Sequence, residues 1–288
     1  DRKGDPMHLH ARLLIDGDRI KNILRCNLAG DEMTHWIRFE QAGRTGFGTL
    51  SGDDIAVCVG DMFAKPTPTG ETLSLADVNV LTPTPAGKML ALWNNSRAMA
   101  AKMDQTEPSE PLYFIKANGS YLGSGGTIRK PQTYNGKVVF EGELGIVIGH
   151  TCQAVSAAAS ESHIFGYTCV NDVTAIGILG KDPSFQQWTR AKSFDTFGVF
   201  GPVVATDLDS SKLVVRTILN GQERQNYPTR DLFFQPAEVV SMISHDVTLH
   251  PGDVICCGTS VGVGSMKPGS TVEVTIEGIG TLRNLYQE

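Results

Sequence analysis

The run of residues 138–149 constrains the fold most, because it is an apolar strand that carries two acids. Its sequence, VVFEGELGIVIG, is β-branched and aromatic and ends in glycine, which is typical of a buried strand. Side chains two residues apart point to the same face of a strand, so Glu141 and Glu143 are expected side by side. Adjacent carboxylates on an apolar strand are costly unless a positive charge lies between them.

Two explanations of this pair are open at the level of sequence. A hard divalent cation prefers carboxylate oxygens and would remove the repulsion between the two acids. An edge strand with a solvated outer face would instead let both carboxylates meet water.

Two residues further along the chain bear on this choice. Asp172 follows the predicted strand 164–170, and an acid at a strand end is exposed to pockets, so Asp172 is a candidate third ligand. An isolated aspartate at such a position is more often a helix N-cap. Lys192 begins the segment KSFDTF, where the aromatic setting indicates anion binding, and the alternative is an ordinary surface lysine.

Composition narrows the class of protein and its partners. The chain has 288 residues, 41% of them hydrophobic and 19% charged, which describes a globular protein of one large domain, or a large and a small one. A net charge of −6 argues against nucleic acid or an anionic membrane as the main partner. We find no apolar run that could span a bilayer and no signal-peptide pattern. The six cysteines show no CxxC spacing, so we expect free thiols and a cytoplasmic location.

The chain divides into three parts by pattern. Residues 1–32 are expected to be an extension, or a segment added to a native chain that starts at Met33, and a genuine N-terminal hairpin is the alternative. Residues 33–85 alternate short strands with turn signals and predict a small β-rich N-terminal domain. Residues 86–288 carry the candidate site and are expected to form the catalytic domain.

Within that larger part, strands outnumber helices. Apolar or alternating runs predict strands at 88–93, 112–116, 164–170, 213–219, 254–257, 272–276 and 280–285. Helices are predicted at 97–103, after the candidate cap Ser96, and at 154–163 and 236–244. Asn220-Gly221 predicts a hairpin turn. The glycine-rich segment 258–264 matches neither nucleotide-binding fingerprint, so nucleotide binding is not expected.

Several short motifs follow one another in a fixed order along residues 88–284, and as an ordered set they are far more specific than any one alone. The motifs are Phe114-Ile115-Lys116, Phe140-Glu141-Gly142-Glu143-Leu144, Gly166-Tyr167, Asn171-Asp172-Val173-Thr174, Lys192-Ser193-Phe194-Asp195, Asn220-Gly221, Pro251-Gly252-Asp253, Gly258-Thr259, Gly262-Val263-Gly264 and Gly278-Ile279-Gly280. This ordered set resembles the fumarylacetoacetate hydrolase family.

The resemblance implies a mixed α/β, β-rich fold with a rolled mixed β-sheet core, usually in a homodimer. It implies an octahedral Mg²⁺ (Mn²⁺ or Ca²⁺ in some members) held by Glu141, Glu143 and Asp172. Family substrates are small 2-oxo or β-diketo acids, including intermediates of aromatic compound catabolism, and a metal-bound enolate is stabilised during the reaction.

The resemblance also implies roles for residues around the metal. Lys192 and Asp172 are the candidate catalytic residues. The candidate substrate-binding residues are Lys116, Lys192, Gly258 and Thr259. Arg97 is added as a candidate from its position in the sequence, because Arg97 or Lys102 could replace a charge lost from the family pattern.

Four positions depart from the family pattern. Many members carry a His and a Glu on a lid helix, where this chain has Ala98 and Ala101, and an Arg and a Gln where it has Ile176 and Leu179. The missing dyad disfavours water activation, so we expect isomerisation, tautomerisation or decarboxylation of a 2-oxo acid. A C–C hydrolase of an acylpyruvate-type substrate with another general base is the alternative. A non-catalytic homologue that binds metal or ligand is a third hypothesis.

Overall fold

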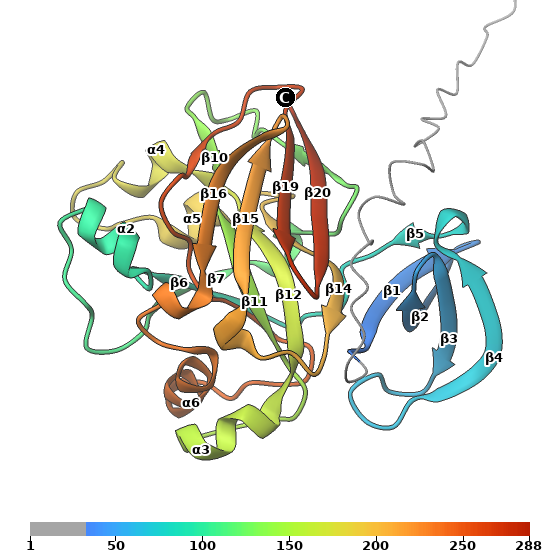
Figure 1. Cartoon of the computed structure of the whole chain (residues 1–288). Helices are drawn as coiled ribbons and strands as arrows, with labels where there is room; N and C mark the ends of the chain where they lie inside the picture. The colour runs from blue at the N-terminus through green and yellow to red at the C-terminus, as the bar shows by residue number, and fades with distance from the viewer. Residues whose placement is uncertain (1–32) are drawn as a thin grey trace, which may run out of the picture.

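The computed structural model describes residues 33–288, so the expectations for residues 1–32 and for Cys26 lie outside the described residues. One twelve-stranded mixed sheet runs through this part of the chain (Figure 1). Its main path is β4 (Thr67–Ser74), β3 (Asp54–Val59), β2 (Arg44–Ser51), β1 (His35–Gln41), β14 (Gly198–Ala205), β12 (Ile164–Asp172), β11 (Gly142–Ile148), β17 (Val254–Cys256), β6 (Met89–Trp93) and β7 (Leu112–Lys116). β5 (Asn79–Val80) adds to β1, and β8 (Tyr121–Leu122) adds to β14.

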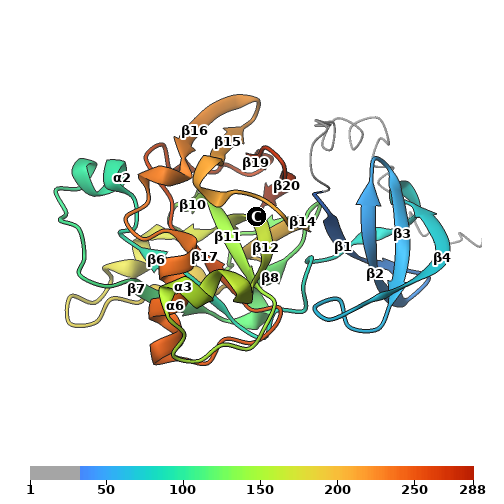
Figure 2. The same cartoon turned by 60° about the horizontal axis from the view of Figure 1, so that its bottom comes forward.

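Strands β1 to β4 stand to one side of the larger body in both ribbon views (Figures 1 and 2). They join it where β1 pairs with β14, with Trp36 opposite Val204. The ring of Phe165 lies 6.0 Å from that of Trp36 and 5.0 Å from that of Phe63. Backbone pairing and an aromatic cluster therefore tie the N-terminal strands to the rest.

The central strand β11 is paired on both sides, with β12 and with β17, and all seven of its residues are buried. This excludes a solvated edge strand as the explanation of the two acids. The predicted run 138–149 is broken at Glu141, because β10 (Val138–Phe140) leaves the main sheet. It pairs instead with β13 (Thr174–Ala175) and β18 (Gly264–Ser265) in a three-stranded sheet.

A five-stranded sheet packs against β11, β12 and β14, and the buried core lies between the two sheets (Figure 1). Its order is β16 (Gln222–Pro228), β15 (Val214–Leu219), β19 (Thr271–Ile276), β20 (Gly280–Gln287) and β9 (Thr127–Arg129). The β15–β16 hairpin turns at Asn220 and Gly221, whose φ angles of +52° and +78° are those that an Asn-Gly turn adopts readily. The prediction of a β-rich mixed fold is confirmed.

Short helices cover two sides of the larger body. α3 (Ala157–Ser160) and α6 (Pro236–Asp246) pack together at one end, while α2 (Arg97–Lys102), α4 (Ile176–Leu179) and α5 (Trp188–Lys192) lie on another side (Figure 1). The predicted helix 154–163 is shorter than expected, because Ala154 has a φ of +51° and cannot continue a right-handed helix. A 3₁₀ turn (Glu161–His163) follows α3.

Two other predictions concern the chain as a whole. No helix among residues 33–288 has the length and apolarity to cross a membrane. The five cysteines in that range are free and buried, as predicted: Cys58, Cys152, Cys169, Cys256 and Cys257.

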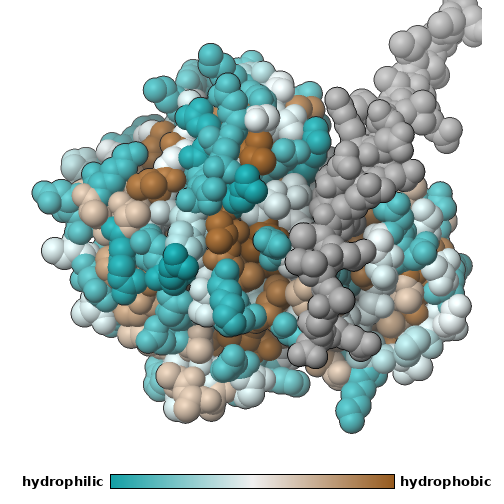
Figure 3. Space-filling view, viewed as in Figure 1, coloured by the Kyte–Doolittle hydropathy of each residue, from teal (hydrophilic) through white to brown (hydrophobic). Residues whose placement is uncertain are grey.

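The face in Figure 3 is hydrophilic over most of its area, with hydrophobic side chains gathered near its middle.

Candidate metal centre and its cavity

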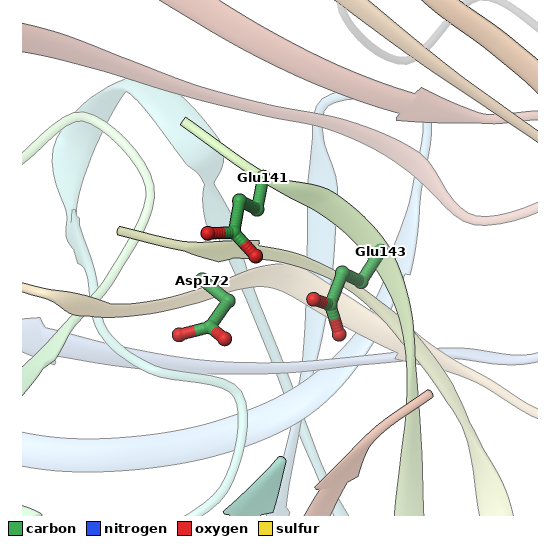
Figure 4. Close-up of side chains that lie close together, drawn as sticks. All are labelled: Glu141, Glu143 and Asp172. Carbon is green, nitrogen blue, oxygen red and sulfur yellow. The ribbon is translucent and has the colours of Figure 1, made fainter. Parts of the chain in front are cut away.

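Three carboxylates converge beside the end of β11 (Figure 4). Glu143 lies on β11, Asp172 ends β12, and Glu141 occupies the break between β10 and β11. One oxygen from each of the three lies within 4.8 Å of the other two. Glu143 and Asp172 are buried and Glu141 is half-buried. The acids predicted as metal ligands from the sequence are therefore brought together by the fold.

Strand pairing and local hydrogen bonds fix this arrangement. The register of β11 and β12 places Gly142 opposite Asn171, so the two glutamates flank the end of β12. The backbone amide of Asp172 donates to the carbonyl of Glu141 at 2.8 Å. The Asn171 side-chain oxygen accepts from the amide of Glu141 at 3.0 Å, and the Thr174 hydroxyl donates to the Glu141 carboxylate at 2.7 Å.

Two buried lysines neutralise part of the acidic charge. The Lys192 ammonium, at the end of α5, donates to Glu141 Oε2 at 2.8 Å and to Asp172 Oδ2 at 2.5 Å. Lys116, at the end of β7, donates to the other oxygen of Asp172. The Lys192 nitrogen also lies 5.3 Å from the centre of the Phe114 ring. Lys192 is only 3% exposed, which excludes an ordinary surface lysine.

These contacts set the charge states of Asp172 and Lys192. Burial opposes ionisation of Asp172, but Lys116 and Lys192 outweigh it and hold the pKa of that carboxyl below its ordinary value. Burial also opposes the charge of Lys192, yet the surrounding carboxylates, Asp172 foremost, raise its pKa above the ordinary value. Asp172 is thus held as an anion and Lys192 as a cation.

Glu143 is the least satisfied of the three acids. One of its oxygens accepts from the amide of Gly258 at 2.8 Å. The other, Oε1, is buried and has no hydrogen-bond partner among residues 33–288. Burial first, and the charge of Asp172 second, raise the pKa of Glu143 well above its ordinary value.

The donor set fits a hard divalent cation. Three carboxylates face two ammonium groups, so one negative charge is uncompensated when all three acids are ionised, and one buried oxygen lacks a partner. Oxygen ligands of this kind are those that Mg²⁺, Mn²⁺ and Ca²⁺ prefer. Glu141, Glu143 and Asp172 are the side chains that would hold such an ion.

A cavity of about 470 Å³ opens onto the carboxylate cluster. That volume lies within the range of small-molecule sites, roughly 300–1,000 Å³. Its lining comprises Leu92, Trp93, Asn94, Ser96, Met99, Met103, Gln105, Phe114, Glu141, Ile176, Leu179, Gln186, Trp188, Lys192, Thr259 and Val263. Glu141 and Lys192 therefore connect the cluster with the space that a ligand would occupy.

Gly258 and Thr259 have structural contacts that their predicted substrate-binding role did not specify. The Gly258 amide donates to Glu143. Thr259 lines the cavity, and its hydroxyl donates to the carbonyl of Gly142 at 3.0 Å. Gln225 was missed at the level of sequence. It donates to Thr259 Oγ1 at 2.8 Å and to the carbonyl of Ser260 at 2.9 Å, and it accepts from the Gly142 amide at 2.9 Å.

The role of Gln225 could not be recognised from the sequence, because β16 (QERQNYP) is polar along most of its length. Gln225 is a buried residue in a strand that also carries exposed polar side chains. Alternation from the Asn220-Gly221 turn, with buried Tyr227 two residues later, is the signal that could have placed Gln225 on the inner face.

The structure does not bring Arg97 to this site. Its guanidinium donates to the carbonyl of Leu232 and lies 4.8 Å from the centre of the Phe233 ring, outside the cavity lining. Lys116 is fully buried against Asp172 and does not line the cavity either. Ile176 and Leu179, which stand at two of the departures from the family pattern, do line it.

Comparison with known proteins identifies the class. The family model for the fumarylacetoacetate hydrolase C-terminal domain matches residues 88–286, and a model named Rv2993c-like, N-terminal, matches residues 34–83. Protein Rv2993c of Mycobacterium tuberculosis is 43% identical over 225 residues, covering 77% of this chain and 83% of that protein. Oxaloacetate tautomerase YisK of Bacillus subtilis is 31% identical over 225 residues, or 74% of each chain.

A solved structure supports the same conclusion. The 2-hydroxyhepta-2,4-diene-1,7-dioate isomerase from Mycobacterium marinum is 37% identical, with a TM-score of 0.81, covering 88% of this chain and 99% of that one. The β-rich fold places the buried carboxylates beside a cavity of about 470 Å³. The chain belongs to the fumarylacetoacetate hydrolase family, whose members include isomerases, tautomerases and hydrolases.

Proposed function

We propose that this protein is a divalent-metal-dependent enzyme that shifts a proton on, or decarboxylates, a small 2-oxo acid. The observation that carries the proposal is the placement of charge in the cavity. Among the lining residues, the titratable groups are Glu141 and Lys192, and both lie at the carboxylate cluster. No histidine or further acid lines the described cavity, so a hydrolytic general base is not provided there.

The cluster suits a substrate that develops negative charge on oxygen. Mg²⁺, the cation we propose here, would withdraw electron density from the carboxylate and carbonyl oxygens of a 2-oxo acid when bound. Lys192 is held as a cation between Glu141 and Asp172, so it would stabilise charge on a substrate oxygen at the mouth of the cluster. Asp172, whose two oxygens both accept from lysines, acts by orienting Lys192.

Thr259 completes the polar end of the cavity. Gln225 fixes the position of its hydroxyl, and we propose that the hydroxyl proton turns from the carbonyl of Gly142 to the acid group of the bound substrate. The names of two relatives, a tautomerase and an isomerase, are consistent with a proton shift. A homodimer is proposed on the resemblance alone.

The test is a reaction assay on purified protein treated with EDTA and then supplied with Mg²⁺. Ketonisation of enolised 2-oxo acids is followed by the loss of enol absorbance, and decarboxylation by release of CO₂. We expect at least one of these reactions to require Mg²⁺. The absence of any effect of Mg²⁺ or EDTA on either reaction would refute the proposal.

Two other outcomes would identify the alternative functions. Release of two acids in equal amounts from an acylpyruvate, without ketonisation, would identify a C–C hydrolase. Thermal stabilisation by 2-oxo acids without turnover of any of them would identify a ligand-binding homologue.

A further inference from the structure

The part of the cavity away from the carboxylate cluster is apolar. Nine lining side chains are aliphatic, aromatic or thioether: Leu92, Trp93, Met99, Met103, Phe114, Ile176, Leu179, Trp188 and Val263. They come from β6, β7, α2 and the residue that follows it, α4, α5 and the loop before β18, so separate elements converge on one apolar surface.

An aromatic wall forms one side of this surface. The ring of Trp188 lies 4.9 Å from that of Trp93, and it stacks on Phe114 at 5.4 Å with an angle of 22° between the planes. The indole N–H of Trp188 already donates to Gln186 Oε1 at 2.8 Å. The wall therefore offers ring surface and no free donor from Trp188.

The neutral polar side chains of the lining are Asn94, Ser96, Gln105, Gln186 and Thr259, and each makes at least one hydrogen bond within the protein. The Asn94 amide donates to the carbonyl of Thr106 at 2.9 Å, and the Ser96 hydroxyl donates to Asp231 at 2.8 Å. Gln186 accepts from Trp188. Lys192 is the cationic side chain of the described lining, and it is already bonded to two carboxylates at the other end. A carboxylate on a substrate tail would find no cation there.

We propose that the substrate carries one carboxylate, at its 2-oxo end, and an uncharged apolar tail that lies against the Trp93–Trp188–Phe114 wall. This inference rests on the proposed function and adds the substrate class. It differs from the dicarboxylates in the names of two relatives, oxaloacetate and a heptadiene-1,7-dioate. A second carboxylate would lose water and meet only neutral donors, such as the side-chain amides of Gln105 and Gln186, which compensate a desolvated charge less well than a cation does.

The test compares two 2-oxo acids that share a head group and differ in the tail. Phenylpyruvate has an apolar ring where oxaloacetate has a carboxylate, and both ketonise from an enol that absorbs in the ultraviolet. With Mg²⁺, we expect kcat/KM for phenylpyruvate to exceed that for oxaloacetate by about tenfold or more. Thermal protection by each acid gives the same comparison without turnover.

A cation placed in the apolar region should reverse the preference. Ile176 is 43% exposed and lines the cavity, so Ile176→Arg adds a guanidinium at little risk to folding. We expect the oxaloacetate-to-phenylpyruvate ratio to rise about tenfold in this variant, and likewise in Leu179→Arg. Ile115→Arg is the matched control, because Ile115 is 48% exposed on β7 and does not line the cavity. Its ratio should equal that of the wild type.

The outcomes distinguish a failure of the apolar-tail proposal from a failure of the proposed function. If Mg²⁺-dependent turnover of oxaloacetate has a kcat/KM equal to or greater than that for phenylpyruvate, the proposal of an apolar tail is refuted and the proposed function is retained. An unchanged ratio in both arginine variants would refute the apolar tail as well. Turnover of neither acid, with no thermal protection by either, would overturn the proposed function and the tail together.

Discussion

Replacing Glu143 by glutamine should stabilise the metal-free protein and abolish its response to Mg²⁺. The hydrogen bond from the Gly258 backbone amide can be kept, because the side-chain oxygen of glutamine can accept it as Glu143 does. The amide nitrogen then stands where Oε1 is buried without a partner, and it offers a donor to the neighbouring carboxylates. The substitution therefore satisfies an unpaired buried group with a side chain that carries no charge at any pH.

The magnitude follows from the cost of an unsatisfied buried acceptor, about 1–3 kcal/mol. At this chain length 1 kcal/mol shifts Tm by about 2 °C, so metal-free Glu143→Gln should melt about 2–6 °C above the wild type at neutral pH. Mg²⁺ at 100 times its Kd should stabilise the wild type by about 2.7 kcal/mol and the variant not at all.

The pH dependence of stability is a second test of whether Glu143→Gln stabilises the metal-free protein. The pKa of Glu143 is raised in the folded state, so the folded protein keeps a proton that the unfolded chain has lost. The stability that Glu143 contributes is therefore present below its ordinary pKa of 4.5 and declines as pH rises towards the folded value. Since glutamine does not ionise, the advantage of the variant over the wild type should grow as pH increases above 4.5.

The assay is thermal unfolding in EDTA at several pH values, repeated with Mg²⁺. Glu71→Gln is the matched control, because Glu71 is exposed on β4 and its substitution should change neither Tm nor the Mg²⁺ response. A metal-free Glu143→Gln protein that melts below the wild type would refute the argument about the unpaired oxygen. A full Mg²⁺ shift in the variant would refute the metal assignment.

Three other substitutions test the supporting contacts. Lys192→Met should lower the free energy of unfolding in urea by about 3–5 kcal/mol, because it leaves buried carboxylates uncompensated. It should also abolish turnover. Near-wild-type stability and turnover would contradict this prediction. Gln225→Met should lower kcat/KM and stability together by freeing the Thr259 segment, and unaltered kinetics would show that Gln225 does not position it. Asp253→Asn should cost about 1–3 kcal/mol by weakening its bonds to Lys88, yet leave kcat/KM unchanged, because neither residue lines the cavity.

Much of the site could be predicted because its signals are local. Two acids at strand spacing, an acid at a strand end and an Asn-Gly turn each depend on a few consecutive residues. The fold places all of them as the spacing implies, with Asp172 beside the paired glutamates. The ordered motifs then identified the family.

What the sequence did not show depends on contacts between distant segments. The break of the predicted strand at Glu141 arises because β10 pairs with β13 and β18, and neither partner is visible from residues 138–149. Gln225 looks like one polar residue among several until the fold places it under Thr259. Arg97 is near Ala98 and Ala101 in the sequence, but Leu232 and Phe233, far along the chain, set the direction of its side chain.

The pairing of β1 with β14 also bears on aggregation. β14 carries the apolar segment Val203-Val204-Ala205, and β1 covers the backbone edge of its last residues. A shortened chain that begins at residue 86 would lack β1, and it would also lack Trp36 and Phe63, whose rings pack on Phe165. It would present an unpaired, apolar strand edge, which is the kind of surface on which protein copies associate. We expect such a shortened chain to self-associate more readily than the full chain does.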